Sequence, residues 1–304
     1  MNMTPVLNQM ASLFILLALG YIANKTKIMS HASDKLFSKV IFNLAMPSTI
    51  LSSVINGKVE LSGGETAFLI LMILLTYALG FVLAAPIGRI LRCEKKDRGL
   101  YSYMIAFGNV GYMGFPIALS IFGEKSAFYV ALFNIPFSLF AFSVGIAMIS
   151  GKGEKFNLLH YINPAFLAAI VSLVIFLTGF KTPAIVADAV GLLSGMTTPG
   201  AMILIGSTLA YIPMKEVFTE WRLYGLTFLK LVITPIVTWL LLKQIISNEL
   251  MLGVLVIMAG MPIATSATMI SMEYGGNERL ASKSIFISTL LSAVTVPLIV
   301  HFLL

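Results

Sequence analysis

The chain has 304 residues, of which 58% are hydrophobic and 11% are charged, and its mean hydropathy is +0.96. A soluble domain carries about 25% charged residues, so this composition excludes an ordinary soluble fold and indicates a lipid surrounding. The net charge of +7 would suit nucleic-acid binding in a soluble protein. Here the basic residues lie in short loops between apolar runs, where Lys and Arg set the orientation of a membrane protein. We therefore expect no nucleic-acid partner.

Ten segments each hold about 20 predominantly apolar residues, the length that a helix needs to cross a bilayer. In chain order the predicted spans are residues 5–24, 33–56, 65–88, 99–122, 126–150, 161–180, 185–212, 221–243, 249–272 and 281–304. The runs are apolar on all sides and lack the alternation of membrane barrels, so we expect an all-α polytopic membrane protein. No basic segment precedes the first run, which is therefore predicted to be a retained span and not a signal peptide.

The positive charges predict which side each loop faces. Fifteen Lys and Arg residues lie in or beside the odd-numbered loops, counted from the N-terminus, and four lie in the even-numbered loops. Because cytoplasmic loops carry the excess of Lys and Arg, the odd loops are predicted to be cytoplasmic. Both termini are then expected on the outer side of the cytoplasmic membrane.

A pattern of prolines recurs in the two halves of the chain, residues 1–150 and 151–304. The four motifs are Ala45-Met46-Pro47, Gly114-Phe115-Pro116, Thr198-Pro199-Gly200 and Gly260-Met261-Pro262. Two halves of five spans each must lie in opposite orientations, because five is odd. The pattern predicts two inverted five-helix repeats, a common plan of secondary transporters, although single membrane prolines are also tolerated without a repeat.

The fourth span contains helix-breaking residues near its middle. Between Gly108 and Pro116 it holds three glycines and one proline; relative to Ala, each Gly costs about 1 kcal/mol and Pro about 3 kcal/mol in a helix interior. Irregular backbone at this depth is tolerated where it lines a cavity. Asn109, Gly111 and Pro116 are therefore candidate substrate-binding residues, with tight helix packing as the alternative role of the small residues.

The ninth span has a counterpart, in which hydroxyl groups replace the amide. The candidates there are Pro262, Thr265, Ser266 and Thr268. If the two broken spans cross, the N-termini of their half-helices direct partial positive charge to one place. This arrangement favours an anion.

Lys230 and Asn134 complete the set of candidates. Lys230 on the eighth span lies about eight residues from Arg222, which corresponds to roughly 12 Å at 1.5 Å per residue. An intramembrane charge is a functional candidate, so Lys230 is expected to attract the anion. Snorkelling and a structural pair with Asp188 or another polar group are the alternatives. Asn134, next to Pro136, can face the same cavity or bond a neighbouring helix.

Signatures of an enzyme or of a primary pump are lacking. The sequence has no H-E-x-x-H motif and no G-x-x-x-x-G-K-[ST] loop to hold ATP. His31, His160 and His301 are too dispersed for a metal site. The single Cys93 excludes an intramolecular disulfide and a cysteine metal cluster. We expect no enzymatic activity, no cofactor and no metal.

Several stretches together resemble the auxin efflux carrier family, in its bacterial branch of malate, malonate and related permeases. They are Phe42–Pro47, Gly108–Pro116, Leu229–Pro235 and Glu273–Asn277, the last followed by Ser288–Ser292 and Pro297. The resemblance implies a scaffold of spans 1, 2, 6 and 7 and a transport domain of spans 3–5 and 8–10, with helices 4 and 9 crossing at their prolines. It also implies a homodimer and an elevator-like motion. Plant members insert a long cytoplasmic loop between the halves, where this chain has only residues 151–161, so the resemblance does not support auxin as the substrate.

These observations predict a carrier or uniporter for a small organic anion, such as a mono- or dicarboxylate, that works by alternating access. A sodium-coupled anion transporter is an alternative, since crossed broken helices can coordinate Na⁺ through carbonyls and hydroxyls. A channel-like or receptor-like membrane protein is another. The sequence leaves the anion, the direction of transport and the coupling ion open.

Overall fold

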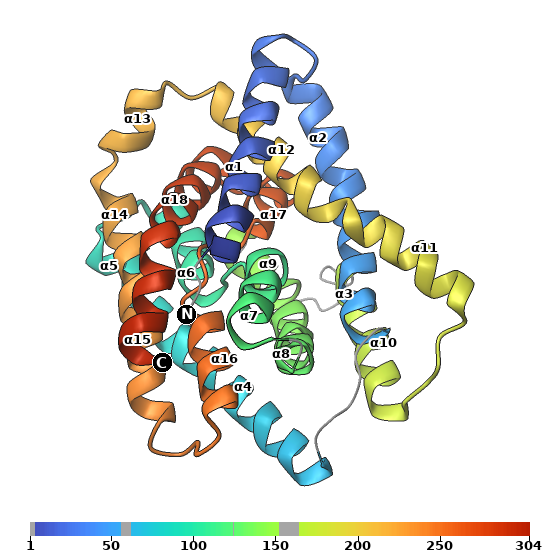
Figure 1. Ribbon diagram of the computed structural model, residues 1–304. Helices are drawn as coiled ribbons and strands as arrows, with labels where there is room; N and C mark the ends of the chain where they lie inside the picture. The colour runs from blue at the N-terminus through green and yellow to red at the C-terminus, as the bar shows by residue number, and fades with distance from the viewer. Residues whose placement is uncertain (1–3, 56–61, 124, 152–163) are drawn as a thin grey trace.

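The computed structural model describes residues 4–55, 62–123, 125–151 and 164–304 (Figure 1). Within these ranges the regular secondary structure is helical, apart from one isolated β-bridge. A backbone inside a bilayer must satisfy its N–H and C=O groups within each segment, and helices do this. The predicted all-α class is confirmed for the described residues.

The N-terminal half contributes α1 (Thr4–Lys25), α2 (His31–Val40), α3 (Met46–Ile55), α4 (Gly63–Ala84), α5 (Ile87–Ile90), α6 (Arg98–Ala106), α7 (Phe115–Phe122), α8 (Ser126–Ala141) and α9 (Val144–Ser150). The C-terminal half contributes α10 (Pro164–Thr178), α11 (Ala184–Gly195), α12 (Thr197–Ala210), α13 (Met214–Thr219), α14 (Trp221–Phe228), α15 (Thr234–Leu242), α16 (Glu249–Ala259), α17 (Ser266–Tyr274) and α18 (Glu278–Leu303).

Four helical stretches of the described chain are long and apolar enough to cross a membrane. They are Gly63–Ile90, Ala184–Ala210, Trp221–Leu242 and Glu278–Leu303. The pair α8 and α9, bent by 40°, can form a fifth. Other predicted spans are divided into shorter helices, as residues 99–122 and 249–272 are. A multi-pass membrane protein follows from these helices, and the number of ten spans stays a prediction.

Three predicted spans contain a π-helical turn that ends two residues before a proline. These turns are η1 (Ile41–Ala45) before Pro47, η3 (Val110–Gly114) before Pro116 and η5 (Leu229–Ile233) before Pro235. Proline has no backbone N–H and its ring clashes with the preceding turn, so a wider turn accommodates it. Such turns inside α-helices are frequent at functional sites.

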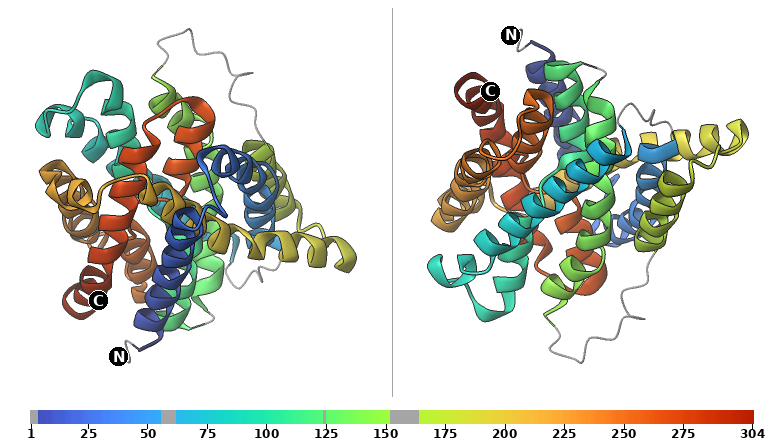
Figure 2. Two further views of the ribbon diagram at one scale, coloured as in Figure 1. Left: turned by 90° about the horizontal axis from the view of Figure 1, so that it is seen from above. Right: turned by 90° about the horizontal axis from the view of Figure 1, so that it is seen from below.

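The helices of predicted spans 1, 2, 6 and 7 pack on one another. α1 lies against α12, and α3 lies against α10 and α11 (Figures 1 and 2). A Cβ atom on Gly20 would lie 2.0 Å from the Ile203 carbonyl oxygen, and one on Gly206 would lie 1.9 Å from that of Leu17. These two glycines let the backbones of α1 and α12 touch, as small residues do in membrane helix pairs. We call α1–α3 and α10–α12 the first helix group.

The remaining helices, α4–α9 and α13–α18, form the second helix group. Within it α4 packs on α6, α15 on α16 and α17 on α18. In Figure 1, α14, α15, α16 and α18 lie on the opposite side of the molecule from α10 and α11. The two groups contain the spans that the family resemblance assigns to a scaffold and to a transport domain.

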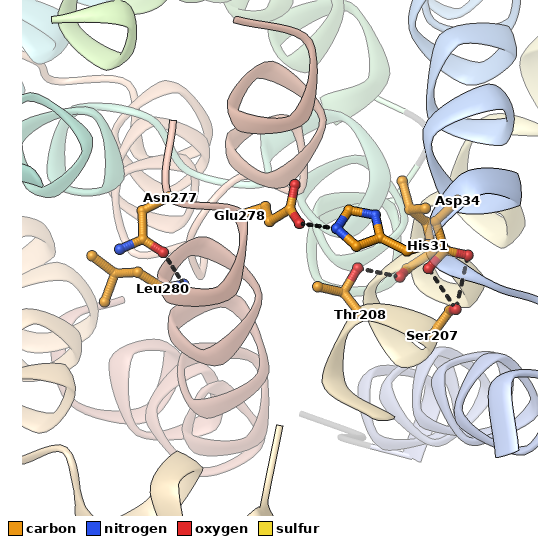
Figure 3. Close-up of polar contacts among 8 residues, drawn as sticks. His31, Asp34, Ser207, Thr208, Asn277, Glu278 and Leu280 are labelled. Carbon is orange, nitrogen blue, oxygen red and sulfur yellow. Dashed lines mark hydrogen bonds and ion pairs between the residues drawn. The ribbon is translucent and has the colours of Figure 1, made fainter. Parts of the chain in front are cut away.

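Polar contacts join the two groups at one end (Figure 3). His31 at the start of α2 places its Nε2 atom 3.3 Å from Oε1 of Glu278, at the start of α18. Near this pair, Asp34 is buried, and the hydroxyl of Ser207 donates to its carboxylate with O–O distances of 2.9 and 2.8 Å. His31 and Glu278 lie beside odd-numbered loops, so this end corresponds to the predicted cytoplasmic side.

Candidate functional site

Both predicted helix breaks are present, and they pair with each other. α6 ends at Ala106, α16 ends at Ala259, and the segments that follow form an antiparallel bridge between Gly108 and Ile263. The backbone N–H of Asn109 donates to the Pro262 carbonyl at 2.7 Å, and the backbone N–H of Ala264 donates to the Phe107 carbonyl at 3.1 Å. Backbone groups that leave a helix in a bilayer need such partners. We call this the crossing.

Packed aromatic rings support the crossing from the side of the fourth span. Phe107 is buried, and its ring centroid lies 4.7 Å from that of Tyr103, 5.7 Å from that of Phe81 and 5.8 Å from that of Phe137. Offset and edge-to-face pairs of this kind add to the stability given by burial. The irregular backbone is therefore held by a dense hydrophobic layer.

A cavity of about 710 Å³ lies at the crossing, between the two helix groups. The second group lines it with Asn109, Val110, Gly111, Phe115, Ala131, Asn134, Phe137, Ser138, Phe142, Ala264, Thr265 and Ser266. The first group lines it with Ser12, Leu13, Leu16, Met46, Thr49, Ile50, Ser52, Ser194, Gly195, Thr198 and Pro199. None of these described lining residues is charged. We call this the central cavity.

Two polar groups at the wall of the central cavity are buried without a partner among the described residues. They are the amide nitrogen Nδ2 of Asn109, a residue that is 2% exposed, and the hydroxyl of Thr265, a residue that is 1% exposed. Leaving a buried donor or acceptor unsatisfied costs about 1–3 kcal/mol. One residue comes from each break, so a polar ligand at the crossing can satisfy both.

The third polar residue of the crossing, Ser266, has a fixed partner. Its hydroxyl lies 2.8 Å from the hydroxyl of Tyr103, a residue that the sequence did not single out. Ser288 accepts a hydrogen bond from the Ile263 amide at 3.2 Å and so holds the ninth span at its break. Neither partner could be identified from the spacing of residues, because each comes from a different helix.

Asn134 and Gly111 line the central cavity together. The Asn134 amide nitrogen donates to the Val130 carbonyl at 2.9 Å, one turn back along α8. A Cβ atom on Gly111 would lie 3.3 Å from Oδ1 of Asn134. The glycine therefore leaves room for this amide, whose oxygen faces the crossing.

Thr268, Pro262 and Lys230 are not among the described residues that line the central cavity. Thr268 is buried, with its hydroxyl 3.2 Å from that of Ser282, and Pro262 acts through its carbonyl at the crossing. Pro116 occupies the second position of α7, and its side chain is outside what the structure describes.

Lys230 is 2% exposed, and its ammonium donates to the Ile105 carbonyl at 3.1 Å. That ammonium lies 3.3 Å from where a Gly108 Cβ would stand, behind the crossing.

A cluster of hydroxyl groups on the first helix group faces the same cavity. The Thr49 hydroxyl lies 2.8 Å from that of Thr197 and accepts a hydrogen bond from Ser194 at 3.2 Å. Thr49 and Ser194 line the central cavity. The sequence offered a partial signal, since Pro47 and Pro199 nearby belong to the repeated proline motifs.

Comparison with known proteins gives concordant matches along the chain. The family model described as a membrane transport protein matches residues 5–160 and 153–300. An uncharacterized transporter of Methanothermobacter thermautotrophicus is 26% identical over 291 residues, which are 94% of this chain and 95% of that protein. A Rhizobium meliloti protein provisionally named as a malonate transporter is 27% identical over 297 residues, 93% of this chain and 91% of that one. The uncharacterized transporter YfdV of Escherichia coli is 21% identical over 310 residues, 98% of each chain.

The matched segments include both helix breaks and nearly the whole chain. All three relatives carry the name of a transporter, and the family is the one that the sequence motifs resemble. The chain therefore belongs to the membrane transport protein family, which is the family of the auxin efflux carriers.

Proposed function

We propose that this protein is a secondary transporter that moves a small carboxylate across the cytoplasmic membrane by alternating access. The proposal is carried by the two buried polar groups, Asn109 Nδ2 and Thr265 Oγ1, that lack a partner among the described residues at the central cavity. A substrate that satisfies them contacts both halves of the chain at once. Mid-membrane sites at broken helices are typical of secondary transporters.

An anion suits the central cavity because the crossing presents donors. The donors at the central cavity are the side-chain amide of Asn109 and the hydroxyls of Thr265 and Ser266. The first turn of α17, which begins at Ser266, lies at the same cavity. A helix N-terminus carries a partial positive charge. No carboxylate is among the described lining residues, so an anion meets no repulsion there.

The lining also bears on the charge and shape of the substrate. Phe115, Phe137, Phe142 and Leu13 give the cavity a large apolar wall beside the polar crossing. Desolvating a charge without a cationic partner is costly, so a substrate with one ionised carboxylate is favoured over a fully ionised dicarboxylate. The provisional malonate assignment of the Rhizobium meliloti relative is compatible with the singly ionised form.

In this proposal Lys230 acts on the substrate from behind the crossing and not by contact. Its ammonium is buried against the Ile105 carbonyl and next to Gly108. A positive charge in a region of low dielectric favours an anion over several ångströms. Lys230→Gln should therefore weaken anion binding more than Lys230→Arg, in a binding assay on folded protein.

Alternating access would come from movement of the second helix group against the first, in the elevator-like manner that the resemblance implies. The central cavity lies between these groups, and the contact of His31 with Glu278 joins them at the predicted cytoplasmic end. This end must open when the substrate is delivered to the cytoplasmic side. The homodimer belongs to the proposal on the basis of the resemblance alone.

Substrate counterflow in proteoliposomes tests the proposal. A carrier loaded with unlabelled carboxylate accumulates the labelled compound by exchange, whereas a pore only equilibrates it and a receptor does not transfer it. The compound is chosen first by a thermal-shift screen of mono- and dicarboxylates. Repeating the screen with and without Na⁺ separates a sodium-coupled transporter, whose ligand binding depends on Na⁺, from a carrier that needs none.

A further inference from the structure

A second cavity of about 390 Å³ lies beside the central cavity. α8 separates the two: Phe128, Leu132 and Ile135 face the second cavity, and Asn134 and its neighbours face the central one. Ala131 on α8 lines both. The two cavities therefore meet at a side chain that consists of a single methyl group. We call the second one the outer cavity.

The outer cavity lies at the end of the molecule away from the His31–Glu278 contact. It is lined by the connection between α10 and α11, which Figure 1 places at the lower right, whereas the connection between α1 and α2 is at the top. This connection is an even-numbered loop, which the charge distribution assigns to the outer side. A ligand that enters the outer cavity can therefore reach the central cavity from the outer side. In this structure the contact between His31 and Glu278 joins the two helix groups at the opposite, cytoplasmic end.

A tight connection positions a cation at the rim of the outer cavity. Gly179 adopts φ +65°, which ends α10, and Pro183 precedes the first residue of α11. The turn holds Lys181 and Thr182 between them, and both line the cavity. Lys181 takes part in none of the ion pairs found among the described residues. Its ammonium is thus available to an anion.

A polar atom and an aromatic wall accompany this cation. The Thr182 hydroxyl is buried and has no hydrogen-bond partner in the described part of the chain. Phe128 and Phe176, which also line the outer cavity, hold their ring centroids 6.2 Å apart with an interplanar angle of 39°. One ammonium and one free hydroxyl suit a single carboxylate, and the two rings suit an apolar or aromatic body.

We infer that the outer cavity is a second binding site for an amphipathic monocarboxylate, which is held by Lys181 and Thr182 before it passes Ala131 into the central cavity. The inference rests on the proposed transport of a carboxylate. It adds a recruitment step, in which a cation outside the uncharged central cavity selects anions electrostatically.

Protection of a reporter cysteine tests the outer site without relying on transport. Phe180, which lines the outer cavity and is largely exposed, is replaced by cysteine in a Cys93→Ala background, and its labelling by an anionic thiol reagent is timed in proteoliposomes. Benzoate at about twice its dissociation constant or more should slow the labelling at least about threefold, because only the unoccupied site reacts. Benzamide, which has the same shape without the charge, should not. Equal protection by both compounds, or by neither, overturns the inference.

Variants at two lysines locate the effect. Protection by benzoate should be lost in Lys181→Gln and kept in Lys181→Arg. Lys243→Gln is the matched control, because Lys243 is predicted to be on the same side but lies 3.7 Å over the ring of Trp239 and away from the cavity. Protection that survives Lys181→Gln, or that disappears equally in Lys243→Gln, contradicts the assignment.

Two further comparisons distinguish a carboxylate site from a lipid site, and the outer binding site from the proposed transport. Labelling in vesicles of phosphatidylcholine alone should be slowed by benzoate as it is in vesicles that also contain phosphatidylglycerol. Protection by phosphatidylglycerol alone would make the cavity a lipid site and overturn the inference. If counterflow fails while benzoate still protects Phe180→Cys, the proposed transport is wrong and the outer binding site stands. If counterflow succeeds without protection, the outer site is wrong and the transport proposal stands.

Discussion

The backbone amide of Asn109 donates to the carbonyl of Pro262 at 2.7 Å, so the two halves of the chain are joined where each helix is broken. The breaks satisfy each other's backbone groups, which removes the main cost of an irregular segment in a membrane. Their side chains are then free for another partner. Asn109 and Thr265 are held in place by this pairing, yet each keeps a polar atom without a partner among the described residues.

Removal of the Asn109 amide should weaken substrate binding and leave the fold intact. Asn109→Ala keeps the backbone hydrogen bond to Pro262 and the neighbouring glycines, so the crossing should survive. We expect the affinity for the carboxylate to fall at least about tenfold, which corresponds to the lower end of the range for loss of a hydrogen bond to a charged group. Asn43→Ala is the control, because the side-chain amide of Asn43 donates to the Lys39 carbonyl, one turn back in the same predicted span. Equal losses in both variants would show a general effect of destabilisation.

Tyr103 should act as a positioning residue through Ser266. Its hydroxyl is 2.8 Å from the Ser266 hydroxyl, which lines the central cavity. Tyr103→Phe should weaken binding about threefold in the native background, the effect of one neutral hydrogen bond. It should have no further effect once Ser266→Ala has removed the partner, and a double-mutant cycle measures this coupling. Tyr77→Phe serves as control, because that hydroxyl contacts the Phe133 carbonyl at 3.4 Å. Additive losses from Tyr103→Phe and Ser266→Ala would contradict the role of Tyr103.

A covalent link between His31 and Glu278 should stop exchange. These residues belong to the two helix groups, and their side chains lie 3.3 Å apart. With both replaced by cysteine in a Cys93→Ala background, a short bifunctional thiol reagent that a reductant can cleave should join them. Counterflow should be lost on linking and restored on cleavage, while each single-cysteine variant stays active. Full exchange in the linked protein would exclude movement of one group against the other at this contact.

The predicted orientation can be checked with two cysteines at exposed positions. Ser62→Cys lies at the start of α4 in an even loop, and Lys96→Cys lies in an odd loop. An impermeant thiol reagent should label the first in intact cells, and the second only after the membrane is opened. Burial raises the pKa of the native Cys93 thiol, which keeps background labelling slow. Labelling of Lys96→Cys in intact cells would contradict the prediction, because it would place this odd-numbered loop on the outer side.

The helix breaks were predictable from the sequence, and the roles of the residues within them were not. Glycine and proline break a helix through local sterics, so the break between Gly108 and Pro116 follows from its composition. Thr265 and Thr268 looked equivalent as hydroxyls, but Thr268 is paired with Ser282 on α18 and Thr265 is not paired within the described residues. Only the tertiary arrangement separates them.

Lys230 shows the same limit of local reasoning. Its depth in the eighth span correctly indicated a buried charge. One alternative was a pair with Asp188, which is absent from the ion pairs of the described residues. A bond to another polar group, also left open, is present, because the ammonium donates to the Ile105 carbonyl near the end of α6. That carbonyl is close to the break in the fourth span. The distance between Lys230 and this carbonyl depends on how the two halves of the chain pack together. The spacing of residues along one helix cannot predict it.

Counterflow by the double variant Asn109→Ala and Thr265→Val tests the central claim most directly. The two substitutions remove the unpartnered polar atom from each side of the crossing. Valine keeps the shape of Thr265, and alanine at position 109 keeps the backbone hydrogen bond to Pro262. The account predicts that the native protein exchanges labelled for unlabelled carboxylate, and that the variant is stable but at least about tenfold slower at low substrate. Native-like exchange by the double variant would show that the substrate binds elsewhere and that the crossing is only a packing device.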